Sequence, residues 1–244
     1  MHQTTYAIDQ GNSVTKAAIF EGSALIDHLR VPNGEESTLL EWIILHRCRG
    51  GIVSSVRADS GQQLREALGE NAMAMHTQLT MPLDILYATP STLGVDRLAN
   101  AVGALSAHAG PHILVIDCGS CLTVTYLENR ALIGGSISPG MRMRYAALAH
   151  FTGKLPLVSP HIQPVPLTGI DTQTAIQSGV QLGMLAEIQE IIQAYCSKIN
   201  PLHVIVTGGD ASYFVPRLKS PIFAEPFLTL MGLHEIYQLQ IIPS

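Results

Sequence analysis

Two stretches of the sequence place an aspartate, a glycine and small polar residues between two apolar runs. The first, YAIDQGNSVTKAAIF, contains Asp9, Gly11, Asn12, Ser13 and Lys16. Such a turn presents successive backbone N–H groups to an anion, Asp9 suits Mg²⁺ held through water, and Lys16 adds a positive charge for a phosphate. An ordinary hairpin turn favours the same Gly and Asn residues, so this stretch alone leaves both interpretations open.

The second stretch, ILVIDCGSCLTVTYL, repeats the order of the first. It offers Asp117, Gly119, Ser120 and Thr123 in the same kind of turn. A third glycine turn, Thr207-Gly208-Gly209-Asp210, follows an apolar run, and there the backbone could approach an adenosine. Each turn is a weak signal by itself. As an ordered set they predict two loops, on duplicated units, that hold a nucleotide from both sides of a cleft.

Cys118 and Cys121 form a C-x-x-C pattern inside the second turn. A redox pair with this spacing normally opens a helix, whose N-terminus lowers the thiol pKa. Here the strand-like sequence LTVTYL follows instead, and a zinc site would need a second pair of ligands. The sequence therefore favours two small residues in a phosphate loop, with a redox or metal role as the weaker alternative.

The tetrapeptide Gly94-Val95-Asp96-Arg97 lies at the start of an expected helix. The helix N-terminus stabilises Asp96 as an anion, so Asp96 could accept the proton of a substrate hydroxyl, as a kinase requires. Arg97 could bind a substrate carboxylate with two hydrogen bonds. The alternative is that Asp96 only complements the helix terminus and that Arg97 is a solvated charge.

The elements expected around these residues define an α/β protein with a duplicated unit. Each Asp-x-Gly stretch predicts a β-hairpin, and Gly110-Pro111 before the second stretch predicts a boundary between domains 1–110 and 111–244. Ile176, Val180, Met184, Ile188, Ile191 and Tyr195 predict an amphipathic helix capped at Asp171 and Thr172. Further strands are expected at 24–31, 51–56, 131–137 and 203–206, and helices at 37–47, 62–68, 95–108 and 225–233.

Composition narrows the class of protein. The net charge of −5 argues against a nucleic-acid binder. The uncharged stretch 98–116 contains Asn100, His108 and Pro111, so we expect a helix end, a turn and a buried strand there, and no membrane span. The first residues, MHQTTYAID, show no secretion signal, which predicts a cytoplasmic protein. Only 14% of the 244 residues are charged, and this suggests that a partner subunit covers some surface.

The motifs together resemble those of the type III pantothenate kinases, within the acetate and sugar kinase, heat-shock chaperone and actin superfamily. The resemblance covers nearly the whole chain. It rests on DQGNSVTK (9–16), TPSTLGVDRLANAVGA (89–104), VIDCGSCLTV (115–124), GGSISPGMRM (134–143), DTQTAIQSG (171–179) and VTGGDA (206–211).

The resemblance implies two tandem ribonuclease H-like (actin-like ATPase) domains with a nucleotide cleft between them, and ATP-dependent phosphorylation of pantothenate. It further implies that the turn from Asp9 to Lys16 binds the ATP phosphates and Mg²⁺, that Ser120 contacts ATP, and that Asp117 holds a monovalent cation, K⁺ or NH₄⁺. Asp96 resembles the catalytic base. Pantothenate contacts would come from Tyr87, Gly94, Val95, Asp96, Arg97 and Thr172, and family members are usually homodimers.

This chain departs from the family in two turns and in length. Gly-Asn-Ser stands for the usual Gly-Asn-Thr, and Asp-Cys-Gly-Ser for Asp-x-Gly-Thr; serine keeps the hydroxyl in both. The chain is short for the family, and the stretch 54–58 lacks an expected proline. Two alternatives of other classes stay open at this point. One is a nucleotide-binding regulator resembling an accessory transcription factor, and the other is a phosphohydrolase of the same superfold.

Overall fold

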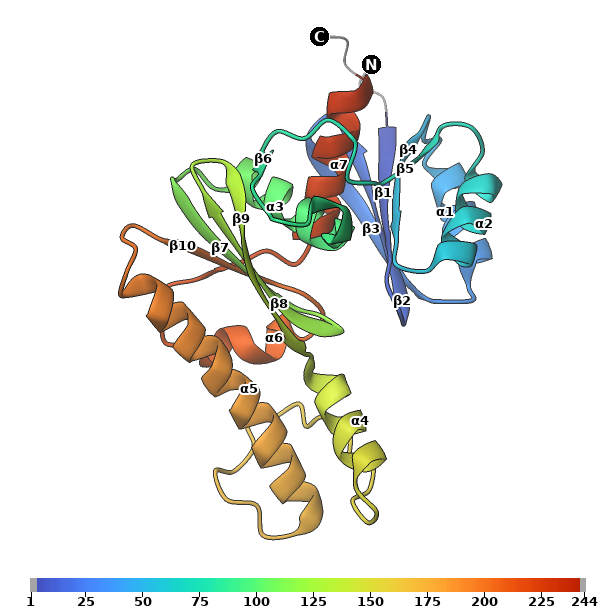
Figure 1. The fold of residues 1–244 in the computed structure, drawn as a ribbon. Helices are drawn as coiled ribbons and strands as arrows, with labels where there is room; N and C mark the ends of the chain where they lie inside the picture. The colour runs from blue at the N-terminus through green and yellow to red at the C-terminus, as the bar shows by residue number, and fades with distance from the viewer. Residues whose placement is uncertain (1–3, 242–244) are drawn as a thin grey trace. The chain divides into compact units, whose positions relative to one another are not determined.

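The computed structural model describes residues 4–241, apart from the side chains of residues 58 and 59 (Figure 1). By spatial contacts the chain divides into two compact units. The first unit contains the described residues up to Ala109, together with Arg130–Leu132 and the C-terminal segment from Phe227. The second unit contains Gly110–Asn129 and Ile133–Pro226. The C-terminal segment therefore packs with the first unit, although it follows the second unit in sequence.

The first unit is built on a five-stranded sheet in the order β3-β2-β1-β4-β5. β2 pairs antiparallel with both β1 and β3, whereas β4 pairs parallel with β1 and β5. Tyr6, Ile8 and Val53 of the sheet pack with Leu39 and Ile43 of α1 and Leu64 of α2 in one core. The bounds are β1 (Thr4–Gln10), β2 (Val14–Glu21), β3 (Ala24–Pro32), α1 (Glu36–Leu45), β4 (Gly51–Ser55), α2 (Ala58–Leu68) and β5 (Ala72–Ala74).

Two further helices complete the first unit, α3 (Val95–Ala107) and α7 (Leu228–Ile241). They pack against each other, and α7 also contacts β1 and β4, on the side of the sheet opposite α1 and α2 (Figure 1). His234 ties α7 to the sheet, because its Nε2 donates to the carbonyl of Gly22 at 2.8 Å and its Nδ1 lies 3.3 Å from the Thr5 hydroxyl. Burial lowers the pKa of His234, which keeps this ring neutral.

The second unit carries strands in the order β11-β10-β7-β8-β9. β7 pairs antiparallel with β8 and parallel with β10, and β10 pairs parallel with β11. The short strand β6 (Asp84–Ile85) pairs with the first residues of β9. The bounds are β7 (His112–Cys118), β8 (Cys121–Glu128), β9 (Ala131–Pro139), α4 (Met141–Phe151), α5 (Thr172–Cys196), β10 (His203–Thr207), α6 (Ala211–Phe214) and β11 (Phe223–Ala224), with 3₁₀ turns at η1 (Pro90–Thr92) and η2 (Val215–Arg217).

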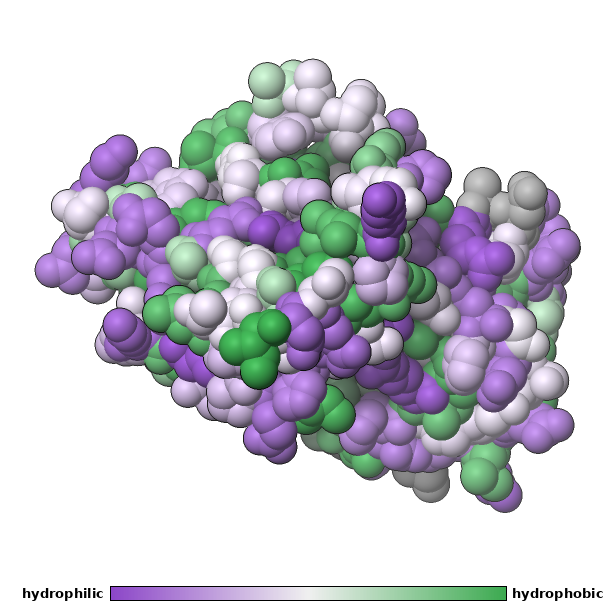
Figure 2. All heavy atoms as spheres, turned by 90° about the horizontal axis from the view of Figure 1, so that it is seen from below, coloured by the Kyte–Doolittle hydropathy of each residue, from purple (hydrophilic) through white to green (hydrophobic). Residues whose placement is uncertain are grey.

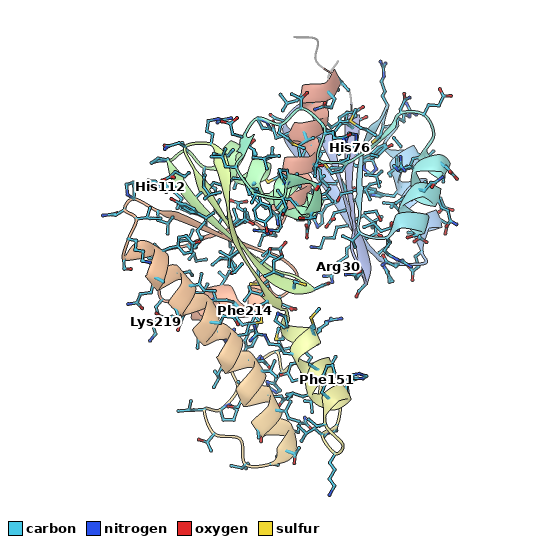
Figure 3. The ribbon with its side chains drawn as sticks, in the orientation of Figure 1. Arg30, His76, His112, Phe151, Phe214 and Lys219 are labelled. Carbon is cyan, nitrogen blue, oxygen red and sulfur yellow. The ribbon has the colours of Figure 1, made fainter. Side chains whose placement is uncertain are left out.

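The amphipathic stripe predicted for α5 is confirmed. Ile176, Val180, Met184 and Ile188 are buried in the core of the second unit, beside β7, β8 and β10. Phe214 of α6, labelled in Figure 3, belongs to the same core. The predicted cap is also present, because the Asp171 carboxylate accepts the Thr174 backbone N–H at 2.7 Å. This bond holds the pKa of Asp171 below its ordinary value.

The two sheets confirm the duplication that the Asp-x-Gly stretches predict. β1, β2 and β4 are related as β7, β8 and β10 are, with one antiparallel and one parallel neighbour for the first strand of each unit. Each hairpin turn therefore lies at the same end of an equivalent strand.

The stretch 98–116 holds the end of α3, a turn and β7, as expected. Within the described residues, no helix is both long and apolar enough to cross a membrane.

Four helices differ clearly from the sequence expectation: α2 and α7 in their bounds, and α4 and the short α6, which were not expected. α2 begins at Ala58, four residues before the expected start, and α7 runs to Ile241, eight residues beyond the expected end. α4 was not expected at all, since Ser138-Pro139-Gly140 indicates a turn and the following sequence shows no clear apolar stripe. Only Met141 and Tyr145 of α4 are buried, so the helix lies mostly at the surface of the second unit.

Candidate functional site

The turn between β1 and β2 is closed by its own backbone and braced by Asn33. The Gly11 N–H donates to the Val14 carbonyl at 3.0 Å. Asn33 donates from Nδ2 to the Gly11 carbonyl at 3.0 Å and accepts at Oδ1 from the Thr15 hydroxyl at 2.9 Å. The side chains of Asn12 and Ser13 are exposed at the tip of the turn. The turn is thus held in shape while its tip stays open to a ligand.

A cation, a carboxylate and a hydroxyl lie side by side across three strands of the first unit. Asp9 on β1 is in register with Lys16 on β2 and with Ser54 on β4. Residues directly opposite one another in a sheet point to the same face. Asp9 and Lys16 are partly exposed, whereas Ser54 is fully buried. This row, which we call the Lys16–Asp9–Ser54 row, lies next to the turn at Gly11.

Asp96 lies in the first turn of α3, where its carboxylate folds over the helix start. Its Oδ1 accepts the Arg97 backbone N–H at 2.8 Å, and a Cβ on Gly94 would collide with this oxygen. Glycine at position 94 therefore leaves room for the carboxylate. Asp96 is partly exposed, and a base that takes a proton from a substrate must be accessible.

Arg97 is not the solvated charge that the alternative interpretation proposed. Its side chain is only 4% exposed, and the guanidinium carbon lies 5.6 Å from the centre of the Tyr87 ring. A buried guanidinium over an aromatic face is held by a cation–π interaction. The structure thus brings Tyr87, Asp96 and Arg97 together at the start of α3.

The turn of the second unit is packed around the Asp117 side chain. Gly208 has a positive φ of 100°, and a Cβ there would collide with Asp117 Oδ1 and lie within 2.6 Å of the Cys118 backbone nitrogen. The Asp210 N–H donates to the Cys118 carbonyl at 2.9 Å. The glycine turn after β10 and the turn after β7 therefore form one structure, in which Ser120 is exposed.

Cys118 and Cys121, the two cysteines of this turn, form no disulfide with each other. Cys118 is fully buried and Cys121 partly buried, and both are free. Burial raises the pKa of the Cys118 thiol, and the Asp117 and Asp210 carboxylates raise it further. A reactive thiol needs a lowered pKa. Among the described residues, no group of three or more His, Cys, Asp or Glu side chains could hold a metal ion. The raised pKa of the Cys118 thiol thus argues against a reactive thiol at this position.

Thr172 is the first residue of α5 and borders an apolar groove between α4 and α5. The groove has a volume of about 870 Å³, and the two helices lie side by side in Figure 1. Arg144 lines the groove and pairs with Glu187 of α5, while its Nε donates to the Pro139 carbonyl at 2.8 Å. Apolar residues line most of the rest: Ala147, Leu148, Phe151, Leu155, Ala175 and Ile176.

The predicted site residues fall into two sets. Asp9, Gly11, Asn12, Ser13, Lys16, Tyr87, Gly94, Val95, Asp96 and Arg97 belong to the first unit, and Asp117, Ser120 and Thr172 to the second. Sequence reasoning missed Asn33, Ser54 and Arg144. Each acquires its place through strand pairing or helix packing between distant residues, and no local pattern in the sequence marks any of them.

Comparisons with known proteins agree on one family. The family model described as type III pantothenate kinase matches residues 6–194. A type III pantothenate kinase from Cytophaga hutchinsonii is 41% identical over 245 aligned positions, which cover 96% of this chain and 98% of that protein.

Solved structures share the fold at low sequence identity. A Campylobacter jejuni protein assigned to the Baf family of transcriptional activators has a TM-score of 0.58 and 18% identity, over 97% of this chain and 98% of that chain. An inorganic polyphosphate/ATP-glucomannokinase from an Arthrobacter species has a TM-score of 0.50 and 16% identity, over 98% and 99%. With two sheets in a mixed α/β arrangement, the expected actin-like ATPase and sugar kinase fold class is confirmed.

Proposed function

The chain belongs to the type III pantothenate kinase family, and from this premise we propose how its residues transfer the γ-phosphoryl group of ATP to the hydroxyl of pantothenate. The product is 4′-phosphopantothenate, the first intermediate on the way to coenzyme A. The observation that carries this function is the 41% identity to a type III pantothenate kinase over nearly both full chains.

The turn after β1 binds the ATP phosphates. Asn12 and Ser13 supply backbone N–H groups at an open tip, Gly11 shapes the turn through its own bond to Val14, and Lys16 supplies a positive charge on the neighbouring strand. Ser120, exposed on the equivalent turn of the second unit, is a further proposed ATP contact through its hydroxyl. Fixed donors of this kind stabilise the charge that spreads over the phosphoryl oxygens during transfer.

Asp96 accepts the proton of the pantothenate hydroxyl as that oxygen attacks the γ-phosphorus. Arg97 binds the pantothenate carboxylate, and Tyr87 orients the guanidinium through the ring contact described above. Gly94 and Val95 present backbone at the same helix start, and the hydroxyl of Thr172, at the start of α5, is a further proposed pantothenate contact. A positioned base and a clamped substrate are the two contributions that phosphoryl transfer requires from side chains.

The Lys16–Asp9–Ser54 row suits a magnesium ion. Mg²⁺ prefers oxygen ligands and keeps several waters, so one carboxylate is enough to hold an ion that is also bound to phosphates. Asp9 would hold it, through water, beside the orphaned hydroxyl of Ser54. When bound, the ion neutralises charge on the phosphate oxygens.

Asp117 is the proposed ligand of a monovalent cation, K⁺ or NH₄⁺. Its carboxylate lies close to the backbone of Gly208 and Gly119, where an added Cβ would meet Asp117 Oδ1. We expect high turnover in K⁺ or NH₄⁺ and little in Na⁺, measured at matched ionic strength. Full activity in Na⁺ alone would contradict the role of Asp117.

A second copy of the chain is the proposed cover for the groove between α4 and α5. Exposed apolar side chains gather on the groove and on the loop that joins the two helices: Phe151, Leu157, Ile162, Leu167 and Ile170, of which Ile170 is 93% exposed. Figure 2 shows hydrophobic residues interspersed with hydrophilic ones on the face seen from below, and Figure 3 labels Phe151 on α4. Large exposed apolar patches on a protein surface mark protein interfaces.

Phe151→Glu is expected to convert a dimer to a monomer, because the phenyl ring is 83% exposed in the isolated chain and a carboxylate would be buried in the dimer. Light scattering gives the molar mass. Ile44→Glu, at a similarly exposed apolar residue on α1 of the first unit, is the matched control and keeps the dimer. A wild-type mass equal to one chain would contradict the proposal.

The expected setting of the reaction is the cytoplasm, with pantothenate and ATP as the small-molecule partners and no role for nucleic acid or a membrane. Mass spectrometry of a reaction with Mg-ATP and K⁺ tests the function: pantothenate becomes heavier by one phosphoryl group. ADP formed without pantothenate would favour the phosphohydrolase, and nucleotide binding without any product would favour the regulator.

A further inference from the structure

Ser54 carries a buried hydroxyl that nothing in the apoprotein satisfies. Its side chain is fully buried at the end of β4, and its Oγ has no hydrogen-bond partner within residues 4–241. Buried polar atoms nearly always have a partner, and an exception asks for an explanation. Because the atom is closed to solvent, a bulk water molecule does not supply the missing bond.

The next residue along β4 shows that the strand itself does not prevent hydrogen bonding. Ser55 points to the opposite face of the sheet, where its hydroxyl has two acceptors within reach, Gln10 Oε1 at 2.8 Å and the Arg57 carbonyl at 2.9 Å, and accepts the Arg57 backbone N–H at 3.0 Å. Two consecutive serines thus differ: the protein satisfies Ser55 in the resting state and leaves Ser54 unsatisfied.

Among the strands, Ser54 has one candidate partner on its own face, which α7 also covers where it packs against β1 and β4. On β1 the residue in register is Asp9. On the other side, the pairing of β4 with β5 ends at Val53 and Ala74, and the Met75 backbone follows, with its N–H bonded to the Val53 carbonyl. Adjacent strands are about 4.8 Å apart, so a small rotation brings the Ser54 hydroxyl within reach of the Asp9 carboxylate.

We propose that Ser54 is a positioning residue for the Mg²⁺ that Asp9 holds: in the metal-loaded enzyme its hydroxyl donates to the Asp9 carboxylate and orients it toward the ion. This inference rests on the proposed function of Asp9. Carboxylates that serve a metal are themselves commonly held by hydrogen bonds, and loss of such a partner typically lowers metal affinity or activity by about 10- to 100-fold.

Ser54→Ala tests the inference through metal binding, without turnover. Mn²⁺ replaces Mg²⁺ in a titration followed by electron paramagnetic resonance, with a non-hydrolysable ATP analogue present. We expect Mn²⁺ affinity to fall about tenfold or more. The Tm of the metal-free variant should equal or exceed that of wild type, because the substitution removes a hydroxyl that has no partner there.

Two further variants keep the test decisive. Ser55→Ala removes hydrogen bonds that the resting protein makes, so it should lower the Tm and leave Mn²⁺ affinity unchanged. Ser54→Thr retains the hydroxyl and should bind Mn²⁺ nearly as wild type does. If Ser54→Ala fails to fold, Ser54→Cys takes its place. Its thiol fills nearly the same space with a weaker hydrogen-bond donor, so this variant should bind Mn²⁺ more weakly than wild type.

Mn²⁺ affinity within twofold of wild type in Ser54→Ala would overturn the inference, as would a lowered metal-free Tm with unchanged affinity. Failure of the proposed function has a different signature, because wild-type enzyme would then give no phosphorylated pantothenate, whatever the Ser54 variants bind.

Discussion

Asp96→Asn is expected to lower kcat by about 10²- to 10⁴-fold, the range that a general base contributes, while ATP binds with unchanged affinity. The amide of asparagine cannot take the proton of the pantothenate hydroxyl. Its oxygen can still accept the Arg97 backbone N–H, as the carboxylate does at 2.8 Å. The start of α3 should therefore keep its shape, and the loss should come from chemistry rather than from folding.

The measurements are kcat at saturating substrates, ATP affinity by calorimetry, and Tm. A Tm equal to that of wild type is the control for folding. A kcat near that of wild type would show that another group takes the proton, and it would remove Asp96 from the mechanism. A large loss of ATP affinity would instead place Asp96 in nucleotide binding.

Gly232→Ala is expected to destabilise the first unit strongly. α3 and α7 cross with their backbones in contact, and a Cβ on Gly232 would collide with the Ala99 carbonyl oxygen and lie 2.8 Å from the Gly103 nitrogen. These atoms belong to backbone and cannot rotate away. Overpacking a core typically costs about 1–3 kcal/mol, occasionally more, against a helix-propensity gain of about 1 kcal/mol from alanine.

Gly183→Ala is the matched control for this substitution. Gly183 also lies inside a helix, α5, but a Cβ there would meet no atom within 4 Å, so the alanine should be neutral or stabilising. Thermal unfolding compares the two variants, with about 2–4 °C expected for each kcal/mol in a chain of this size. Because α3 carries Asp96 and Arg97, Gly232→Ala should lower activity as well. Equal Tm values for both variants would contradict the described helix crossing.

Local patterns explain why most of the fold could be predicted from the sequence. The two hairpins follow from Asp-x-Gly turns between β-forming runs, and α5 follows from its buried stripe and the Asp171 cap. α4 was missed because only Met141 and Tyr145 are buried, which leaves no stripe to read. The start of α7 was expected at residue 225, but the helix begins at Leu228, after the last of the prolines at 216, 221 and 226.

In the candidate site, too, the residues that could be predicted lie in local sequence patterns, and those that could not depend on contacts between distant residues. The turn at Gly11 and the helix start at Asp96 are local features, and the sequence predicts both. Arg97 was open between a solvated and a bound charge, because its burial depends on Tyr87, which lies outside the helix. Asn33 and Ser54 reach the site only through strand pairing, so no spacing in the sequence could have indicated them.

The central claim is that the phosphoryl group passes to a pantothenate hydroxyl and not to water. The most direct test measures ADP and 4′-phosphopantothenate in the same quenched reaction, with Mg-ATP, K⁺ and pantothenate present. The account predicts one molecule of ADP for each molecule of phosphorylated product, and no ADP when pantothenate is omitted. ADP that accumulates without pantothenate, or in clear excess over the phosphorylated product, would contradict it.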